Sequence, residues 1–154
     1  MKRSTLNSII RDAEAFFESY DFKLPPWAHW KPEQWEGLGP DYREVVENML
    51  GWDVTDFNVG TFEKRGLVLF TVRNGNLAKK DKPYAEKIMI VGINQETPYH
   101  FHWNKMEDII NRGGGTLVLD LAKSDEKEEL SDAPFTVQVD GVTRHYNGPG
   151  RLEL

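Results

Sequence analysis

Cysteine is absent from this 154-residue chain. Disulfides, thiolate metal ligands and thiol nucleophiles are therefore excluded, and any metal ion must be bound through nitrogen and oxygen. Long apolar runs are also missing, since no stretch approaches the length that spans a bilayer and residues 1–7 lack the apolar core of a signal peptide. We therefore expect a cytoplasmic protein with no membrane partner.

Basic residues are outnumbered. The chain has 19 Lys plus Arg against 25 Asp plus Glu, a net charge of −6, and no basic cluster. Because such a surface repels phosphate backbones, nucleic acid is not expected as a partner. Hydrophobic residues make up 39% and charged residues 29%, as in globular proteins, which excludes a disordered acidic chain. The length predicts a single domain over residues 1–154.

The first part of the sequence is helical in character. Apolar residues recur at helical spacing over residues 4–20, which predicts an amphipathic helix. Residues 23–39 are rich in proline and tryptophan, which predicts an irregular segment whose aromatic rings pack on a larger body. A short helix is predicted over residues 40–49, with Pro40 in its first turn. Residues 1–50 should thus form a helical N-terminal layer.

Residues 51–154 have the composition of β structure. Stretches rich in β-branched and aromatic residues alternate with glycine and Asn-Gly turns, which predicts a barrel or sandwich. Residues 123–131 are expected to form a charged, solvated loop, and residues 151–154 to start another strand. Residues 57–72 form β-like stretches cut by Gly60 and Gly66. Further strands are predicted over residues 85–93, 97–103, 115–122, 135–139 and 142–146, with a tight hairpin turn at Asp140-Gly141 between the last two.

Two histidines mark the most informative segment. His100 and His102 are separated by one residue in a strand-like context, so both rings should project from one face while aromatic neighbours pack on the other. Glu107 follows five residues after His102, and the glycines at residues 113–115 permit a chain reversal near the pair. Two imidazoles and a carboxylate suit Mn²⁺, Fe²⁺, Ni²⁺, Co²⁺ or Zn²⁺. The alternative is a surface histidine pair with an unrelated glutamate.

The spacing of these residues resembles the first motif of the cupins, which has a glycine, then His-x-His, then a glutamate, then a glycine. This sequence departs from the motif at the leading glycine, where it has Asn94. The run HFHWNKMEDIINRGGG at residues 100–115 is more specific, and it resembles the metal motif of the D-lyxose isomerases. The tryptophan-rich N-terminal layer is similar too, so the resemblance covers most of the chain. It implies a mainly β fold, a cupin-type barrel (jelly roll) with an N-terminal helical layer.

The resemblance also implies a function. Members of this family are dimeric cupins that interconvert an aldose and a ketose, D-lyxose with D-xylulose and D-mannose with D-fructose, with a divalent metal that is usually Mn²⁺. His100, His102 and Glu107 correspond to three of four metal ligands. The fourth, a histidine, and the general base are expected beyond Leu154, so we expect the chain to be truncated and its last barrel strands to be missing. His145 is not assigned as a ligand.

Two lysines are candidates for contacts with sugar hydroxyls or with the oxyanion that forms as a proton moves between carbons. Lys87 lies in a predicted strand and shares a face with apolar residues, so it sits either in a polar pocket or in solvent. Lys105 lies between the predicted ligands, where the alternative is a solvated loop lysine.

Two other functions remain open. Two histidines and one carboxylate also form the facial triad of non-haem iron oxygenases. A non-catalytic sugar-binding cupin is the third possibility, although the N-terminal helices lack the basic recognition helix of a DNA-binding regulator.

Overall fold

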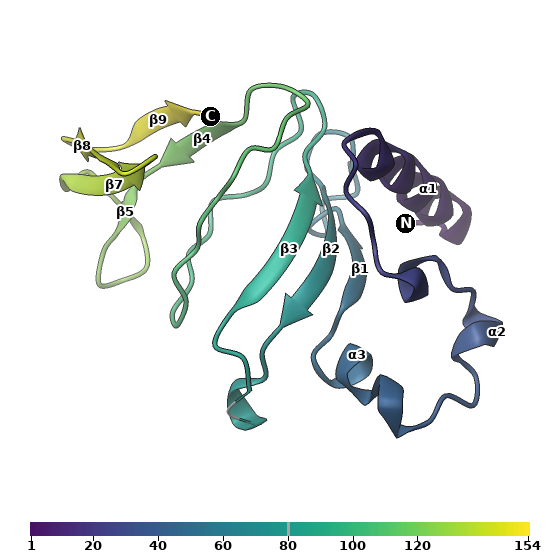
Figure 1. The fold of residues 1–154 in the computed structure, drawn as a ribbon. Helices are drawn as coiled ribbons and strands as arrows, with labels where there is room; N and C mark the ends of the chain where they lie inside the picture. Colours follow the sequence, from purple (N-terminus) through teal and green to yellow (C-terminus); the bar gives the residue numbers. More distant parts are fainter. Residues whose placement is uncertain (80) are drawn as a thin grey trace. The chain divides into compact units, whose positions relative to one another are not determined.

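A computed structural model describes residues 1–79 and 81–154 of the chain (Figure 1). The chain divides into two compact units, Met1–Pro98 and Tyr99–Leu154, and each is considered by itself. Within the described ranges, none of the helices has the length and apolar character that crossing a membrane requires.

The helices of the first unit confirm the predicted N-terminal layer. The long helix α1 spans Arg3–Ser19, close to the predicted residues 4–20. The proline- and tryptophan-rich segment is mostly irregular and contains two single-turn helices. The predicted helix at residues 40–49 divides into a 3-10 turn and the short helix α3. The shorter helices are η1 (Pro26–His29), α2 (Pro32–Trp35), η2 (Pro40–Tyr42), α3 (Arg43–Glu47) and η3 (Leu77–Lys79).

The first unit also contains an antiparallel sheet in the order β1-β2-β3. Its strands are β1 (Gly51–Thr55), β2 (Leu67–Asn74) and β3 (Ala85–Ile90). Because side chains alternate along a strand, the register places Trp52, Phe70 and Ile88 on one face. Thr71 and Lys87 are paired on the opposite face.

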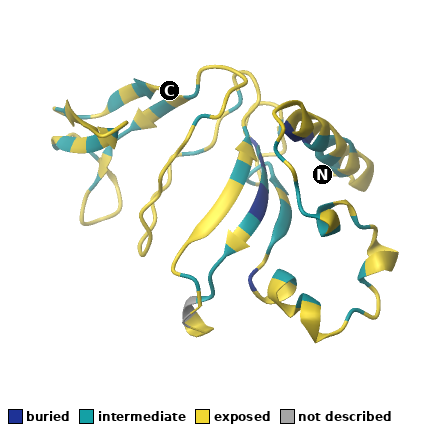
Figure 2. Ribbon diagram, viewed as in Figure 1, coloured by how far each residue is buried: buried dark blue, intermediate teal, exposed yellow. Residues whose placement is uncertain are grey.

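The core of the first unit lies between the sheet and the N-terminal layer. Phe70 is completely buried, and it packs against Trp27 and Trp52, with ring centroids 5.2 and 5.1 Å away. Phe17 of α1 stacks on Trp52, with centroids 5.9 Å apart and planes 5° from parallel. Figure 2 shows the buried positions on β2, on α1 and just after α3. The tryptophans therefore attach the helical layer to the sheet, as their packing role predicts.

A β-bulge interrupts the pairing of β2 with β3. Thr71 pairs with Lys87, but the next pair along is Arg73 with Glu86, so β2 carries one extra residue at this point. Arg73 and Glu86 form an ion pair beside the bulge. Bulges bend the strand and change the direction of nearby side chains. This bulge therefore affects the direction of the β3 side chains that pair beside it, Glu86 and Lys87.

The second unit consists of three two-stranded sheets. The hairpin of β7 (Phe135–Val139) and β8 (Val142–Tyr146) has the predicted bounds. Its turn residues Asp140 and Gly141 have φ of 50° and 80°, the left-handed values that a tight hairpin of this type requires. The other pairs join β4 (Val118–Leu121) to β9 (Gly150–Glu153), and β5 (Lys123–Ser124) to β6 (Leu130–Ser131).

Some sequence expectations were wrong. Residues 97–103 form no strand; between β3 and β4 the chain is irregular except for one isolated bridge from Glu96 to Arg65. Pro98 cannot donate to a strand ladder, which disfavours a regular strand there. Residues 123–131 are not purely a loop, because β5 and β6 pair at its base. The strand β1 was missed although Trp52 and Val54 alternate with polar residues.

The mainly β fold with a helical N-terminal layer is confirmed. The strands in the described part of the chain form four separate sheets and no closed barrel, and they are consistent with part of a cupin-like fold. Helices other than η3 precede residue 50, and strands begin at Gly51. The single-domain organisation of residues 1–154 stays a prediction.

Candidate metal centre

The predicted ligands lie in the irregular segment that begins the second unit. The chain bends at residues 103–104, between His102 and Glu107. It bends again at the glycines of residues 113–115, where the sequence predicted a reversal.

The end of this segment is attached to the body of the second unit. The amide of Asn111 donates hydrogen bonds to the carbonyl oxygens of Gly115 and Leu154, both at 2.8 Å. The side-chain oxygen Oδ1 of Asn111 accepts a hydrogen bond from the backbone N–H of Gly113 at 3.0 Å. Leu117 and Leu154 exchange two backbone hydrogen bonds of 2.9 Å, continuing the β4–β9 pairing. Asn111 thus holds the glycine turn at residues 113–115 against Leu154, the residue that follows β9.

His100, His102 and Glu107 converge, and we call them the His–His–Glu group. Each offers one ligand atom, and these atoms lie within 4.8 Å of one another. The two imidazole rings have centroids 5.1 Å apart and planes at 74°. The Nε2 of His102 is 3.5 Å from Oε2 of Glu107. The sequence prediction that these three side chains meet agrees with this geometry, although a bent loop and not a strand presents them.

Lys105 lowers the pKa of the neighbouring carboxylate of Glu107. Its Nζ donates a hydrogen bond to Oε1 of Glu107 at 3.2 Å. Partial burial raises the pKa of Glu107, but the hydrogen bond and charge of Lys105, together with the charges of His102 and His100, outweigh it, and the pKa is lower than usual. The carboxylate is therefore ionised at neutral pH, as a metal ligand must be.

The donor set fits a transition-metal ion. Two imidazole nitrogens and one carboxylate oxygen, without sulfur, suit Mn²⁺, Fe²⁺, Co²⁺, Ni²⁺ or Zn²⁺ better than Ca²⁺ or Mg²⁺, which prefer oxygen alone. All three residues are exposed, so an ion and a small ligand can reach them from solvent. Three protein ligands leave coordination positions open, as a catalytic metal site requires.

The aromatic residues between the ligands do not pack as expected. Tyr99, Phe101 and Trp103 were predicted to form a buried face, but their exposed fractions are 56%, 41% and 72%. The rings of Phe101 and Trp103 contact each other, with centroids 4.9 Å apart. Without a strand there is no opposite face, so these rings remain accessible beside the His–His–Glu group.

The two predicted lysines lie in different units. Lys105 is next to the ligands. Lys87 is exposed on β3, on the sheet face opposite the aromatic core, and it lines a hollow of about 390 Å³ in the first unit. This hollow, called the Lys87 hollow below, is lined by Met49, Leu50, Gly51, Trp52, Asp53, Leu69, Thr71, Asn74 and Lys87. Lys87 is exposed and lines this hollow, and its contact with a sugar stays a prediction.

The sequence reasoning missed the partners of Lys87. Thr71 is only 5% exposed and pairs directly with Lys87, and Asp53 lines the same hollow from β1. A polar residue within the apolar run of β2 was a usable signal, but the register that brings the two together is not visible in the sequence. His145 is exposed on β8 and is not part of the His–His–Glu group.

Comparison with known proteins gives a consistent result. The family model described as D-lyxose isomerase matches residues 1–154. A D-lyxose/D-mannose isomerase of Escherichia coli O157:H7 is 45% identical over 157 aligned residues, which cover 100% of this chain and 69% of that protein. A D-lyxose/D-mannose isomerase of Serratia proteamaculans matches with the same identity and coverage.

Proposed function

Because this chain belongs to the D-lyxose isomerase family, we propose that it acts as a metal-dependent aldose–ketose isomerase. Its substrates are D-lyxose and D-mannose, which it converts to D-xylulose and D-fructose. The observation that carries the metal dependence is the convergence of His100, His102 and Glu107 within 4.8 Å. The names of the relatives support the substrates.

The reaction moves a proton between C1 and C2 of the sugar while negative charge develops on the two neighbouring oxygens. The ring nitrogens of His100 and His102 and a carboxylate oxygen of Glu107 would hold the divalent ion, Mn²⁺ by preference. When bound, the ion supplies positive charge that stabilises the developing oxyanion and orients the substrate.

The lysines supply the other positive charges. Lys105 stabilises the ionised form of Glu107 through the hydrogen bond of 3.2 Å, and its remaining N–H groups can donate to a sugar hydroxyl. Lys87 presents its ammonium group in the Lys87 hollow, where it can donate to a hydroxyl or oxyanion of the substrate. We assign neither lysine as the base that carries the proton.

Turnover without oxygen tests this function. The protein loaded with Mn²⁺ should convert D-lyxose or D-mannose to the ketose under anaerobic conditions, measured by chromatography of the sugars. Oxygen uptake by the Fe²⁺-loaded protein without any isomerisation would instead identify an oxygenase. Sugar binding without turnover of either kind would identify a non-catalytic sugar-binding protein.

We also propose that the protein is a cytoplasmic homodimer with a small sugar as its ligand. The strand β3 is an edge of the three-stranded sheet, and the N-terminal layer is largely exposed, so each offers a surface for a second copy. Light scattering should give twice the chain mass of 17.8 kDa. A single-chain mass at micromolar concentration would reject the dimer.

A further inference from the structure

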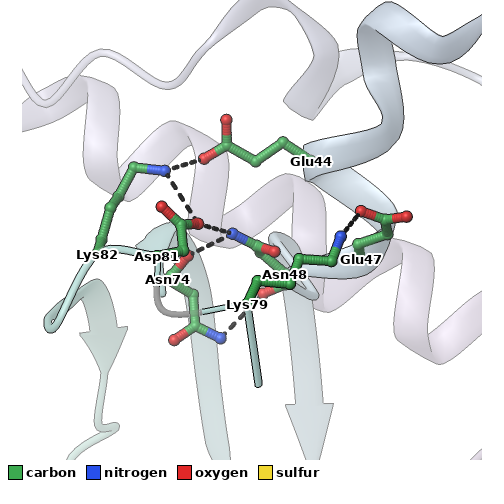
Figure 3. Close-up of polar contacts among 7 residues, drawn as sticks. All are labelled: Glu44, Glu47, Asn48, Asn74, Lys79, Asp81 and Lys82. Atoms are coloured by element: carbon green, nitrogen blue, oxygen red, sulfur yellow. Dashed lines mark hydrogen bonds and ion pairs between the residues drawn. The ribbon is translucent and has the colours of Figure 1, made fainter. Parts of the chain in front are cut away.

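A buried asparagine follows α3, remote in sequence from every predicted site residue. Asn48 is only 4% exposed. Its Nδ2 donates to the carbonyl oxygen of Asn74 at 2.8 Å and to Oδ2 of Asp81 at 3.0 Å. The Nδ2 of Asn74 donates in return to the carbonyl oxygen of Asn48 at 2.9 Å. We call these three residues the Asn48 clamp (Figure 3).

The clamp joins three segments of the first unit. Asn48 ends α3, Asn74 ends β2, and Asp81 lies in the connection between β2 and β3. Exposed ion pairs flank it, joining Lys79 to Glu47 and Lys82 to Glu44. Figure 3 shows these pairs on either side of the central asparagine.

The connection lies close across the end of β2. A Cβ added to Gly75 would be 1.6 Å from the carbonyl oxygen of Lys82, so no larger residue fits there without a shift of backbone. The pKa of Asp81 is lowered, first by its hydrogen bond with the backbone of Lys82 and next by the bond from Asn48. The aspartate is therefore an ionised acceptor at neutral pH, and the amide of Asn48 is held in one orientation.

The clamp lies next to the Lys87 hollow. Met49, the next residue in sequence, and Asn74, the clamp partner, both line that hollow. Asn74 also pairs with Ala85, the first residue of β3, which is two positions before Lys87. The bulge between Thr71 and Arg73 lies on the same side of Lys87, between the Thr71–Lys87 pair and the clamped Asn74–Ala85 pair. The clamp and the bulge together therefore determine the register of the segment of β3 that leads to Lys87.

We propose that Asn48 is a positioning residue for Lys87. It touches no substrate; it fixes the start of β3 and the rim of the hollow so that the ammonium group is presented in one place. The catalytic part of this inference rests on the proposed isomerase function, since it assumes that Lys87 contacts the sugar.

The kinetic test is a double-mutant cycle on the Mn²⁺-loaded protein with D-lyxose. Asn48→Ala should lower kcat/KM by roughly tenfold to a hundredfold, since displacement of a reacting group by about 1 Å has effects of this order. In the Lys87→Met background the same change should produce no further loss. Glu47→Gln, which removes the surface ion pairs of Glu47 with Lys79 and Arg43 and leaves the clamp bonds in place, should stay within about twofold of the parent. Losses that multiply in the double mutant would overturn the proposal.

A spectroscopic test does not depend on turnover. Lysine amines are labelled by reductive ¹³C-methylation, and the signals of Lys87 and Lys105 are assigned by Lys→Arg variants in metal-free protein. Asn48→Ala should shift the Lys87 signal and leave that of Lys105 unchanged. Should Asn48→Ala fail to fold, Asp81→Ala removes one clamp bond without emptying a buried site, and it should shift the Lys87 signal in the same direction.

The two proposals fail in different ways. An unshifted Lys87 signal in both variants would overturn the positioning role of Asn48, whether or not the protein isomerises sugars. If the Lys87 signal shifts as expected in the variants but the parent protein converts no sugar, the isomerase function is rejected and the positioning of Lys87 by the clamp still holds.

Discussion

The side chain of Asn48 is buried and has a structural role, whereas the side chains of the His–His–Glu group are exposed and have a proposed chemical role. Asn48, with a 4% exposed fraction, satisfies its amide inside the fold. His102 and Glu107 instead have side chains that are 30% and 37% exposed, and they hold their position through one another and through Lys105. A metal ligand must be reachable, so its placement depends on a few polar contacts and not on burial.

Removing one imidazole tests the assigned ligands. His102→Ala should lower the affinity for Mn²⁺ by more than about a hundredfold, because even the loss of a residue that hydrogen-bonds to a metal ligand lowers metal affinity or activity by about 10–100-fold. Turnover should disappear with the metal. Metal content after dialysis and isomerase rate measure both effects. His145→Ala, an exposed histidine outside the His–His–Glu group, is the matched control and should retain both. A His102→Ala protein with full metal content and activity would remove the assigned site.

The pair of Asp120 and Arg151 gives a prediction on pH. Arg151 donates to both carboxylate oxygens, from Nε at 2.8 Å and from Nη2 at 3.1 Å. The hydrogen bond from Arg151 lowers the pKa of Asp120 below its ordinary value of 3.8, although burial opposes it. A carboxylate whose pKa is lowered in the folded state adds stability above its unfolded pKa, and this stability is lost as the pH falls through the folded pKa.

Asp120→Asn should therefore be slightly less stable than the parent at neutral pH, with the difference disappearing as the pH falls through the lowered pKa of Asp120. The effect is small because the pair is exposed to solvent. Urea unfolding across this pH range measures it, and Arg151→Met should give the same pH profile. A stability difference between parent and variant that grows toward acid pH would contradict the lowered pKa of Asp120.

At the scale of elements, the central strand β2 organises the first unit. It pairs with β1 on one side and β3 on the other, and Val68 and Phe70 point from it into the core. The opposite face of the same strand presents Thr71 to the Lys87 hollow. Because one strand serves both faces, the packing of the aromatic core determines the position of the polar residues behind it.

Phe70→Ala should destabilise the first unit by about 3–5 kcal/mol, the usual cost of removing a fully buried phenylalanine. The ring is completely buried and contacts Trp27 and Trp52, so its loss leaves a cavity between the sheet and the helical layer. Denaturant unfolding followed by tryptophan fluorescence measures the change. Val46→Ala, at a residue with an exposed fraction of 72%, is the control and should change stability little. Equal losses in the two variants would contradict this description of the core.

At the scale of the whole molecule, the candidate residues are distributed over two units. The His–His–Glu group and Lys105 belong to Tyr99–Leu154, whereas Lys87 and the Asn48 clamp belong to Met1–Pro98. The three predicted metal ligands come from a single irregular segment of eight residues, 100–107. An ion bound there would join both ends of that segment and restrict its motion.

Metal should therefore stabilise the protein. An ion that binds only the folded state at a free concentration of a hundred times its Kd adds about 2.7 kcal/mol. Thermal unfolding with added Mn²⁺ should show a higher Tm than in EDTA, and the shift should grow with metal concentration. The His102→Ala protein should show no such shift. An equal Tm with Mn²⁺ and EDTA in the parent protein would contradict metal binding at this segment.

The sequence by itself determined the local features. The spacing of apolar residues predicted α1, the Asp140-Gly141 turn predicted the β7–β8 hairpin, and the residues of the ligand segment predicted the His–His–Glu group. Each of these depends on residues close together in the chain, where side-chain periodicity and turn chemistry act directly.

Only the tertiary structure decided the relations between distant segments. It replaced the expected strand at residues 97–103 with a bent loop, paired Lys87 with Thr71, and brought Asn48 to Asp81 across 33 positions of sequence. Strand register and long-range hydrogen bonds depend on which segments pack together, and that follows from burial of the whole core and not from any local pattern.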